Sequence, residues 1–159
     1  MASNIDNNFD LGPDILSEVK EMKFGIVVSN WNKNITDNLF DGAYKTLVKY
    51  GVKEENIIKI EVPGSFELVY GCKIMSKNNV DAVIAIGCII KGETDHYDYI
   101  CSSVSSGITQ LNIINDTPIV FCVLTLSISF VIKSIYFCTK PCANLVGSSN
   151  APALMLLLT

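Results

Sequence analysis

Arginine is absent from this sequence: all 12 basic residues are lysines, opposed by 16 aspartates and glutamates. The resulting net charge of -4 and a pI near 4.9 argue against a nucleic-acid binder, which requires a basic surface. Histidine and tryptophan each occur once, as His96 and Trp31. Any chemistry that needs an imidazole or an indole ring therefore depends on one of these two residues.

Metal-ligand patterns and export signals are also missing. The six cysteines form no C-x-x-C pair, and none has a histidine at a spacing typical of zinc ligands. The first 14 residues are polar and rich in Asn and Asp, unlike a signal peptide. Four cysteines lie inside apolar runs, where this residue packs as a small hydrophobe. We therefore expect no metal site, reduced thiols and a cytoplasmic location.

Charge nearly disappears from the last part of the 159-residue chain. All 16 acidic residues and 10 of the 12 lysines precede residue 126, and only Lys133 and Lys140 are charged after it. The length suggests a single folded domain. We accordingly divide the chain into a polar N-terminal extension (1–21), an α/β domain (22–125) and an atypical apolar tail (126–159).

Within the central part, apolar runs alternate with amphipathic stretches. Four runs are typical of buried strands: 24–28, 57–62, 81–90 and 118–124. Three stretches have apolar residues at helical spacing: 35–50, 66–75 and 94–113. This alternation predicts a four-stranded parallel sheet with right-handed crossovers and helices on both faces, a three-layer α/β/α sandwich.

Ligands of such sheets bind beyond the carboxyl ends of the strands. Four segments should therefore converge at one edge: 29–33, 63–67, 88–96 and the stretch after Phe121. This expectation concerns the location of a site and is independent of what binds there.

Two residues in the third segment are candidates for chemistry. His96 is suited to proton transfer, since imidazole is the side chain most often used for it near neutral pH, but an exposed loop or capping histidine is the alternative. Thr94 stands at the expected start of a helix with Asp95 and, three residues later, Asp98. That start either holds an anion on its backbone N–H groups or is merely capped by these side chains.

The other segments each contribute one candidate. Trp31, in the polar loop SNWNKN, either stacks on a planar ring or anchors the loop to the protein body. Glu67 follows Pro63-Gly64-Ser65-Phe66, where its carboxylate either complements a helix dipole or accepts hydrogen bonds from ligand hydroxyls.

These residues lie in motifs that resemble those of a known family. The chain resembles lumazine synthase, the penultimate enzyme of riboflavin synthesis, in order over about residues 22–125. Four segments carry the resemblance: FGIVVSNWN (24–32), VPGSFEL (62–68), IGCIIKGETDHYDYIC (86–101) and PIVFCVLT (118–125). The combination of GETDHYDYIC with an upstream PGSFE is the most specific of them.

The resemblance implies a flavodoxin-like fold and a condensation that needs no metal or redox cofactor. In that family a ribitylamino-aminouracil reacts with a phosphorylated dihydroxybutanone to give dimethylribityllumazine. The family assembles as homopentamers, sometimes as capsids of pentamers, with active sites between subunits. Small-molecule substrates and copies of the chain itself are thus the implied partners.

The resemblance also implies site residues. His96 would transfer protons, and Trp31 would stack on the pyrimidine ring. The remaining positions would bind substrate: Ser65, Phe66 and Glu67 the uracil and ribityl chain, Cys88, Ile89 and Ile90 the heterocycle through their backbone, Glu93 and Thr94 the butanone phosphate, and Phe121 the pyrimidine of a neighbouring subunit.

The tail departs from the family after Thr125. The family continues with a helix that carries a phosphate-clamping arginine and a Gly-Asn-Lys-Gly turn, neither of which this chain has. Arginine recognises phosphate with two parallel hydrogen bonds, and lysine serves that purpose less well. One hypothesis is a tail that is out of frame or unspliced. Another is a membrane segment over 117–132, which at 16 residues falls short of the roughly 20 that a spanning helix needs.

Two functions remain open at this point. The first is a lumazine-synthase-type transferase whose activity the tail weakens. The second is a non-catalytic member that binds a flavin-like or pteridine-like ring or forms a shell, because the clamping arginine is missing. A binding protein would tolerate replacement of His96, whereas an enzyme would lose turnover and keep ring binding.

Overall fold

Four parallel strands form one sheet in the computed structural model, which describes residues 18–127. The strands are β1 (Phe24–Ser29), β2 (Ile57–Val62), β3 (Ala82–Lys91) and β4 (Ile119–Ser127), arranged in the order β2-β1-β3-β4. The chain moves outward from β1 to β2 and then returns past β1 to β3. The direction of winding therefore reverses between β1 and β3, which makes this pair the topological switch point of the sheet.

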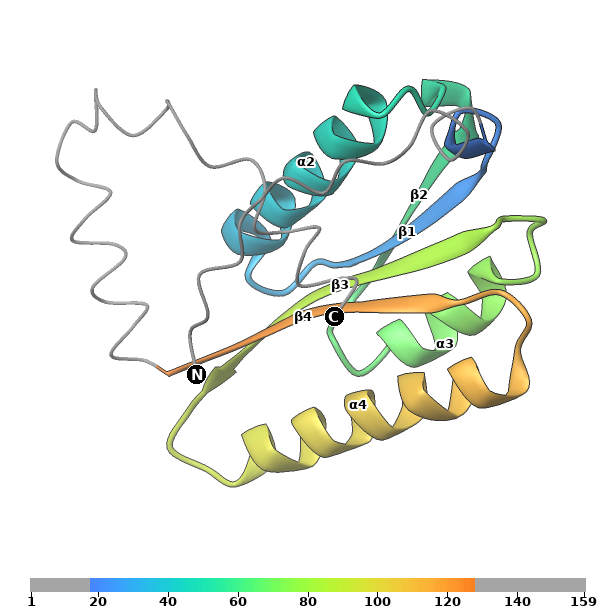
Figure 1. Cartoon of the computed structure of the whole chain (residues 1–159). Helices are drawn as coiled ribbons and strands as arrows, with labels where there is room; N and C mark the ends of the chain where they lie inside the picture. Colours follow the sequence, from blue (N-terminus) through green and yellow to red (C-terminus); the bar gives the residue numbers. More distant parts are fainter. Residues whose placement is uncertain (1–17, 128–159) are drawn as a thin grey trace, which may run out of the picture.

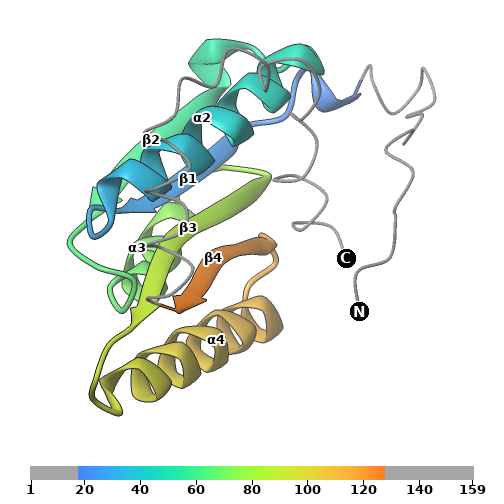
Figure 2. The same cartoon turned by 90° about the vertical axis from the view of Figure 1, so that its left-hand side faces the viewer.

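Helices cover both faces of the sheet, as the sequence predicts. α2 (Lys33–Lys49) lies on one face, and α3 (Leu68–Met75) and α4 (His96–Ile114) lie on the other (Figures 1 and 2). A short 3-10 helix, η1 (Glu54–Asn56), precedes β2. The three-layer α/β/α sandwich of flavodoxin-like type is confirmed.

Side chains that alternate along the strands build two cores. On β1, Ile26 and Val28 pack towards α2, where Ala43 and Leu47 meet them. Val27, between them in the sequence, packs on the opposite face with residues of α3 and α4. β3 is buried on both faces over residues 82–89, which explains its nearly continuous apolar run.

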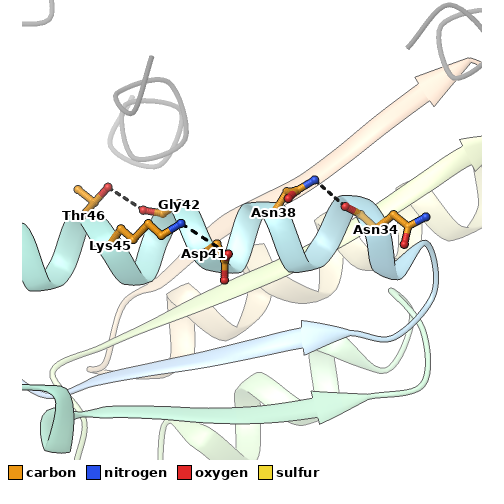
Figure 3. Close-up of polar contacts among 6 residues, drawn as sticks. All are labelled: Asn34, Asn38, Asp41, Gly42, Lys45 and Thr46. Carbon is orange, nitrogen blue, oxygen red and sulfur yellow. Dashed lines mark hydrogen bonds and ion pairs between the residues drawn. The ribbon is translucent and has the colours of Figure 1, made fainter. Parts of the chain in front are cut away.

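The outer face of α2 is polar. Asn38 donates a hydrogen bond to the Asn34 carbonyl, and Lys45 forms an ion pair with Asp41, each across one helical turn (Figure 3). Such exposed pairs contribute a few tenths of a kcal/mol, about the amount expected of i,i+4 contacts. This face carries no candidate site residue and faces away from the sheet.

Four predicted boundaries are wrong by two residues or more. α2 begins at Lys33 rather than Ile35, and α3 begins at Leu68 rather than Phe66. β4 continues past Leu124 to Ser127, because its backbone stays paired with β3 as far as Lys91. α4 begins at His96 rather than Thr94, and Asp95 occupies the N-cap with helical backbone angles and no side-chain hydrogen bond to the helix. The expected cap by Thr94 or Asp95 is therefore not formed.

The hypotheses about the tail fall mostly outside the described residues. Of the proposed membrane segment, residues 119–127 form strand β4, and 128–132 lie beyond the described range. No helix within residues 18–127 is long and apolar enough to cross a bilayer. The N-terminal extension up to residue 17, Lys133 and Lys140 also lie outside the described range.

Candidate active site at the carboxyl edge of the sheet

The loops that follow β1 and β2 meet at one backbone atom of strand β3, the carbonyl oxygen of Cys88. The Asn32 side-chain amide donates a hydrogen bond to this oxygen at 3.1 Å, and the Ser65 hydroxyl donates a second at 3.4 Å. A further bond joins the Asn30 N–H to the Val62 carbonyl at 2.8 Å. Three of the four segments expected to converge are thus joined at the switch point.

Beyond this junction, β3 runs past the end of β1. The pairing of the two strands ends at Val28 and Ile86, whereas β3 continues to Lys91. From Cys88 on, no strand lies beside β3 on this side. Apart from the Cys88 carbonyl, which Asn32 and Ser65 occupy, the backbone groups on this side can bond to a ligand as they would to an added strand.

The Ser65 hydroxyl reaches Cys88 because residue 87 is glycine. A Cβ at Gly87 would lie 2.8 Å from Ser65 Oγ and 2.8 Å from Leu68 Cδ1. Both distances are shorter than real Cβ contacts allow, so the close approach of the loop after β2 to β3 depends on the missing side chain.

Two aromatic rings near this junction are exposed. Trp31 is 73% exposed and Phe66 is 55% exposed. Anchoring of the loop by a buried indole, one of the two interpretations open from the sequence, is therefore wrong. Rings of this size left in solvent beside open backbone groups are suited to stack on a planar ligand.

Glu67 has a partial structural role. Its Oε2 accepts a hydrogen bond from the Gly64 N–H at 2.9 Å, which folds the loop after β2 back on itself. The residue is the N-cap of α3 but makes no side-chain bond to that helix. The second carboxylate oxygen has no partner among residues 18–127 and faces solvent, so it can accept a hydrogen bond from a ligand hydroxyl.

The end of β3 and the start of α4 carry the polar candidates. Lys91, the last residue of β3, places its Nζ 5.6 Å from the centre of the Tyr97 ring. Glu93, Thr94 and His96 follow, all exposed. No side chain caps α4, and the Asp98 N–H donates to the Asp95 carbonyl, which leaves the N–H groups of His96 and Tyr97 to solvent or to an anion.

The structure joins some of the candidates by direct contacts and leaves others apart. Within the described range, Ser65 and Cys88 are bonded to each other and Asn32 fixes the loop of Trp31. His96 begins α4, five positions after β3 ends, and its side chain makes no hydrogen bond within residues 18–127.

Phe121 lies apart from the junction. It is 40% exposed on the edge strand β4 and pairs in register with Ala85. Since Ala85 precedes Cys88 by three residues, Phe121 is about 10 Å from the junction along the strand.

Asn32 is a residue of the junction that no sequence pattern singled out. The residue has a left-handed backbone (φ 59°, ψ 45°), a conformation that asparagine adopts more readily than other residues with a side chain. An asparagine directly before an amphipathic helix is the only signal in the sequence, and it would have suggested a helix cap.

Burial raises the pKa of the Cys88 thiol to about 11, from an ordinary value near 9. Below that pH the thiol is neutral, so at pH 8 only about one molecule in a thousand carries a thiolate. The C88A variant should therefore keep kcat within about twofold, because the role expected of residue 88 uses its backbone and not its thiol. Steady-state assays of C88A beside C72A, which removes a buried thiol from the core, test this; a tenfold loss in C88A alone would contradict it.

The Ser29 hydroxyl is the one buried side-chain polar atom without a hydrogen-bond partner in the described range. Burying an unpaired hydroxyl costs about 1–3 kcal/mol. We expect S29A to raise the free energy of unfolding by about 1 kcal/mol in urea denaturation. S65A, which removes a paired hydroxyl, should lower it. A loss of stability in S29A would show that the hydroxyl has a partner after all.

The fold and this edge define a flavodoxin-like α/β protein with a candidate ligand site at the switch point of its sheet. A family model described as 6,7-dimethyl-8-ribityllumazine synthase matches residues 21–129. Curated proteins of that name are similar to the chain. The protein from Parabacteroides distasonis is 48% identical over 79% of each chain, and that from Christiangramia forsetii is 46% identical over 79% of this chain and 76% of its own. The protein from Bacteroides fragilis is 56% identical over 65% of this chain and 73% of its own.

The chain therefore belongs to the 6,7-dimethyl-8-ribityllumazine synthase family. The matched stretch contains every candidate residue of the site, from Trp31 to Phe121, and the whole described sheet. The resemblance noted in the sequence is confirmed.

Proposed function

We propose that the chain condenses 5-amino-6-(D-ribitylamino)uracil with 3,4-dihydroxy-2-butanone 4-phosphate to give 6,7-dimethyl-8-ribityllumazine. The junction at the Cys88 carbonyl carries this proposal. It brings an exposed indole, a free carboxylate oxygen and an open strand edge to the switch point of a chain from this family. The substrates are inferred from the family.

In this proposal the pyrimidine occupies the space beyond the end of β1. Its ring stacks on Trp31, and its polar edge bonds to the backbone of β3 between Cys88 and Ile90, including Ile89. Ser65 and Phe66 line the same space, and the free oxygen of Glu67 accepts a hydrogen bond from the ribityl chain. A flat ring with several donors and acceptors matches an aromatic surface beside peptide groups.

The phosphate of the second substrate lies at the start of α4. Uncapped N–H groups there carry the positive end of the helix dipole, and Glu93 and Thr94 line the approach. An arginine, which this chain lacks, would bind the phosphate more tightly than these N–H groups do.

The reaction follows from positioning and proton transfer. Binding both substrates at one edge replaces an encounter in solution by an intramolecular step, which accounts for most of the expected acceleration. Imine formation, loss of phosphate and ring closure each move protons, and His96 supplies an exposed imidazole next to the phosphate position. No step requires a metal or a redox cofactor.

We further propose that the chain works as a homo-oligomer, a pentamer or a capsid of pentamers. Phe121 is too far from its own Cys88 to reach the pyrimidine, so a neighbouring copy would supply this ring. Large apolar side chains also lie exposed on the outer side of α3 and α4, namely Tyr70, Ile74, Tyr99, Ile113 and Ile114. Such a surface is typical of a protein interface. A cytosolic location is part of the same proposal.

The full chain, purified and mixed with the two substrates, tests the proposal. The expected result is formation of the lumazine, followed by its absorbance, in a preparation whose mass in solution is a multiple of 17.4 kDa. An assembled, folded protein that binds the pyrimidine but makes no lumazine would contradict catalysis. In that case the non-catalytic ring-binding function would apply.

A further inference from the structure

The side chain of Asn32, in the loop after β1, makes a contact with the neighbouring strand β3. It occupies the N-cap position of α2, where asparagine commonly accepts a hydrogen bond from the helix, yet it makes no such bond. Its amide instead donates to the Cys88 carbonyl, 56 residues away in the sequence. The residue thereby gives up the local cap and also adopts a left-handed backbone.

The Cys88 carbonyl is correspondingly saturated. A backbone carbonyl oxygen has two lone pairs, and here Asn32 and Ser65 each donate to it. This oxygen is consequently an internal anchor and has no remaining capacity for a substrate donor. The backbone groups that remain available to a ligand are then the N–H of Cys88 and the groups of the following residues of β3.

We propose that Asn32 is a positioning residue for the adjacent indole. Its amide ties the loop after β1 to the Cys88 carbonyl and so holds Trp31 at a fixed place beside the open edge of β3. The inference rests on the proposed function in one respect, namely that the ligand ring stacked on Trp31 is the pyrimidine. The fixing of the indole itself does not depend on which ligand binds.

Two variants separate the amide from the backbone conformation. N32D keeps the size of the side chain and its tolerance of the left-handed region but removes the donor. N32G accepts the same backbone without strain and removes the side chain. N38D is the matched control, because Asn38 also donates to a backbone carbonyl, at 2.8 Å, on the exposed face of α2 away from the site (Figure 3).

The indole provides a direct readout in the substrate-free protein. Trp31 is the single tryptophan, so fluorescence anisotropy and quenching by acrylamide report on this loop alone. We expect N32D and N32G to show lower anisotropy and more efficient quenching than the wild type, and N38D to match the wild type. Circular dichroism confirms that the compared variants are folded.

Kinetics provide the second readout. The Michaelis constant for the pyrimidine should rise about tenfold in both Asn32 variants, with kcat at saturation within about twofold of the wild type. If the full chain makes no lumazine but the anisotropy still falls in N32D and N32G, the proposed function fails and the positioning role stands. Unchanged anisotropy and quenching in a folded N32D and N32G would overturn the positioning role, whatever the activity.

Discussion

The H96Q variant is expected to lose kcat by about 10²-fold or more while it still binds the pyrimidine. Glutamine keeps hydrogen-bonding capacity and similar length but cannot carry a proton between reacting groups, a contribution usually worth 10²–10⁴ in rate. His96 is exposed at the first position of α4 and is the only histidine of the chain, so no second imidazole can replace it.

Two measurements make this prediction decisive. Steady-state assays give the loss in kcat, and quenching of Trp31 fluorescence by the pyrimidine gives its affinity, which should stay within about threefold of the wild-type value. If H96Q turned over as fast as the wild type, the imidazole would have no part in the reaction. Loss of pyrimidine binding together with turnover would instead assign His96 to the ring site.

The G87A variant should have the largest effect on the architecture of the site. The added methyl group would lie 2.8 Å from both Ser65 Oγ and Leu68 Cδ1 and 3.3 Å from Val123 Cγ1. Overpacking of this kind costs about 1–3 kcal/mol. The loop after β2 must move away from β3, which breaks the bond of Ser65 to the Cys88 carbonyl and raises the Michaelis constant for the pyrimidine.

The control for this variant is G92A. Gly92 follows β3, and a Cβ there would meet no atom within 4 Å, so its free energy of unfolding should change by less than about 0.5 kcal/mol. Chemical denaturation of both variants beside the wild type measures the difference. Equal stability of G87A and the wild type would show that the sheet and loop can separate without cost.

Much of the fold can be predicted from the sequence because local patterns of apolar residues determine the strands and helices. The predicted run 81–90 is apolar from Ala82 on, as a strand covered on both faces must be, and β3 spans Ala82–Lys91. Ala43 and Leu47, at helical spacing, pack against the sheet as expected. The errors at the ends of β4 and α4 arise because strand pairing with β3 and the placement of the cap are decided by neighbours distant in the sequence.

The site was predictable in location but not in its connections. Parallel strands bring their following loops to one edge, so the loops of Trp31 and Ser65 were expected near Cys88. The bond of Asn32 to the Cys88 carbonyl joins residues 56 positions apart, and no local pattern indicates it. The exposure of Trp31 was likewise undecided, because an indole in a polar loop is compatible with both burial and stacking.

A crystal structure of the full chain with 5-amino-6-(D-ribitylamino)uracil would test the proposed site at the Cys88 junction most directly. The account predicts the pyrimidine ring against the Trp31 indole, with its polar edge within hydrogen-bond distance of the β3 backbone just past Cys88. A ring bound elsewhere, with the indole and this edge of β3 unoccupied, would contradict it.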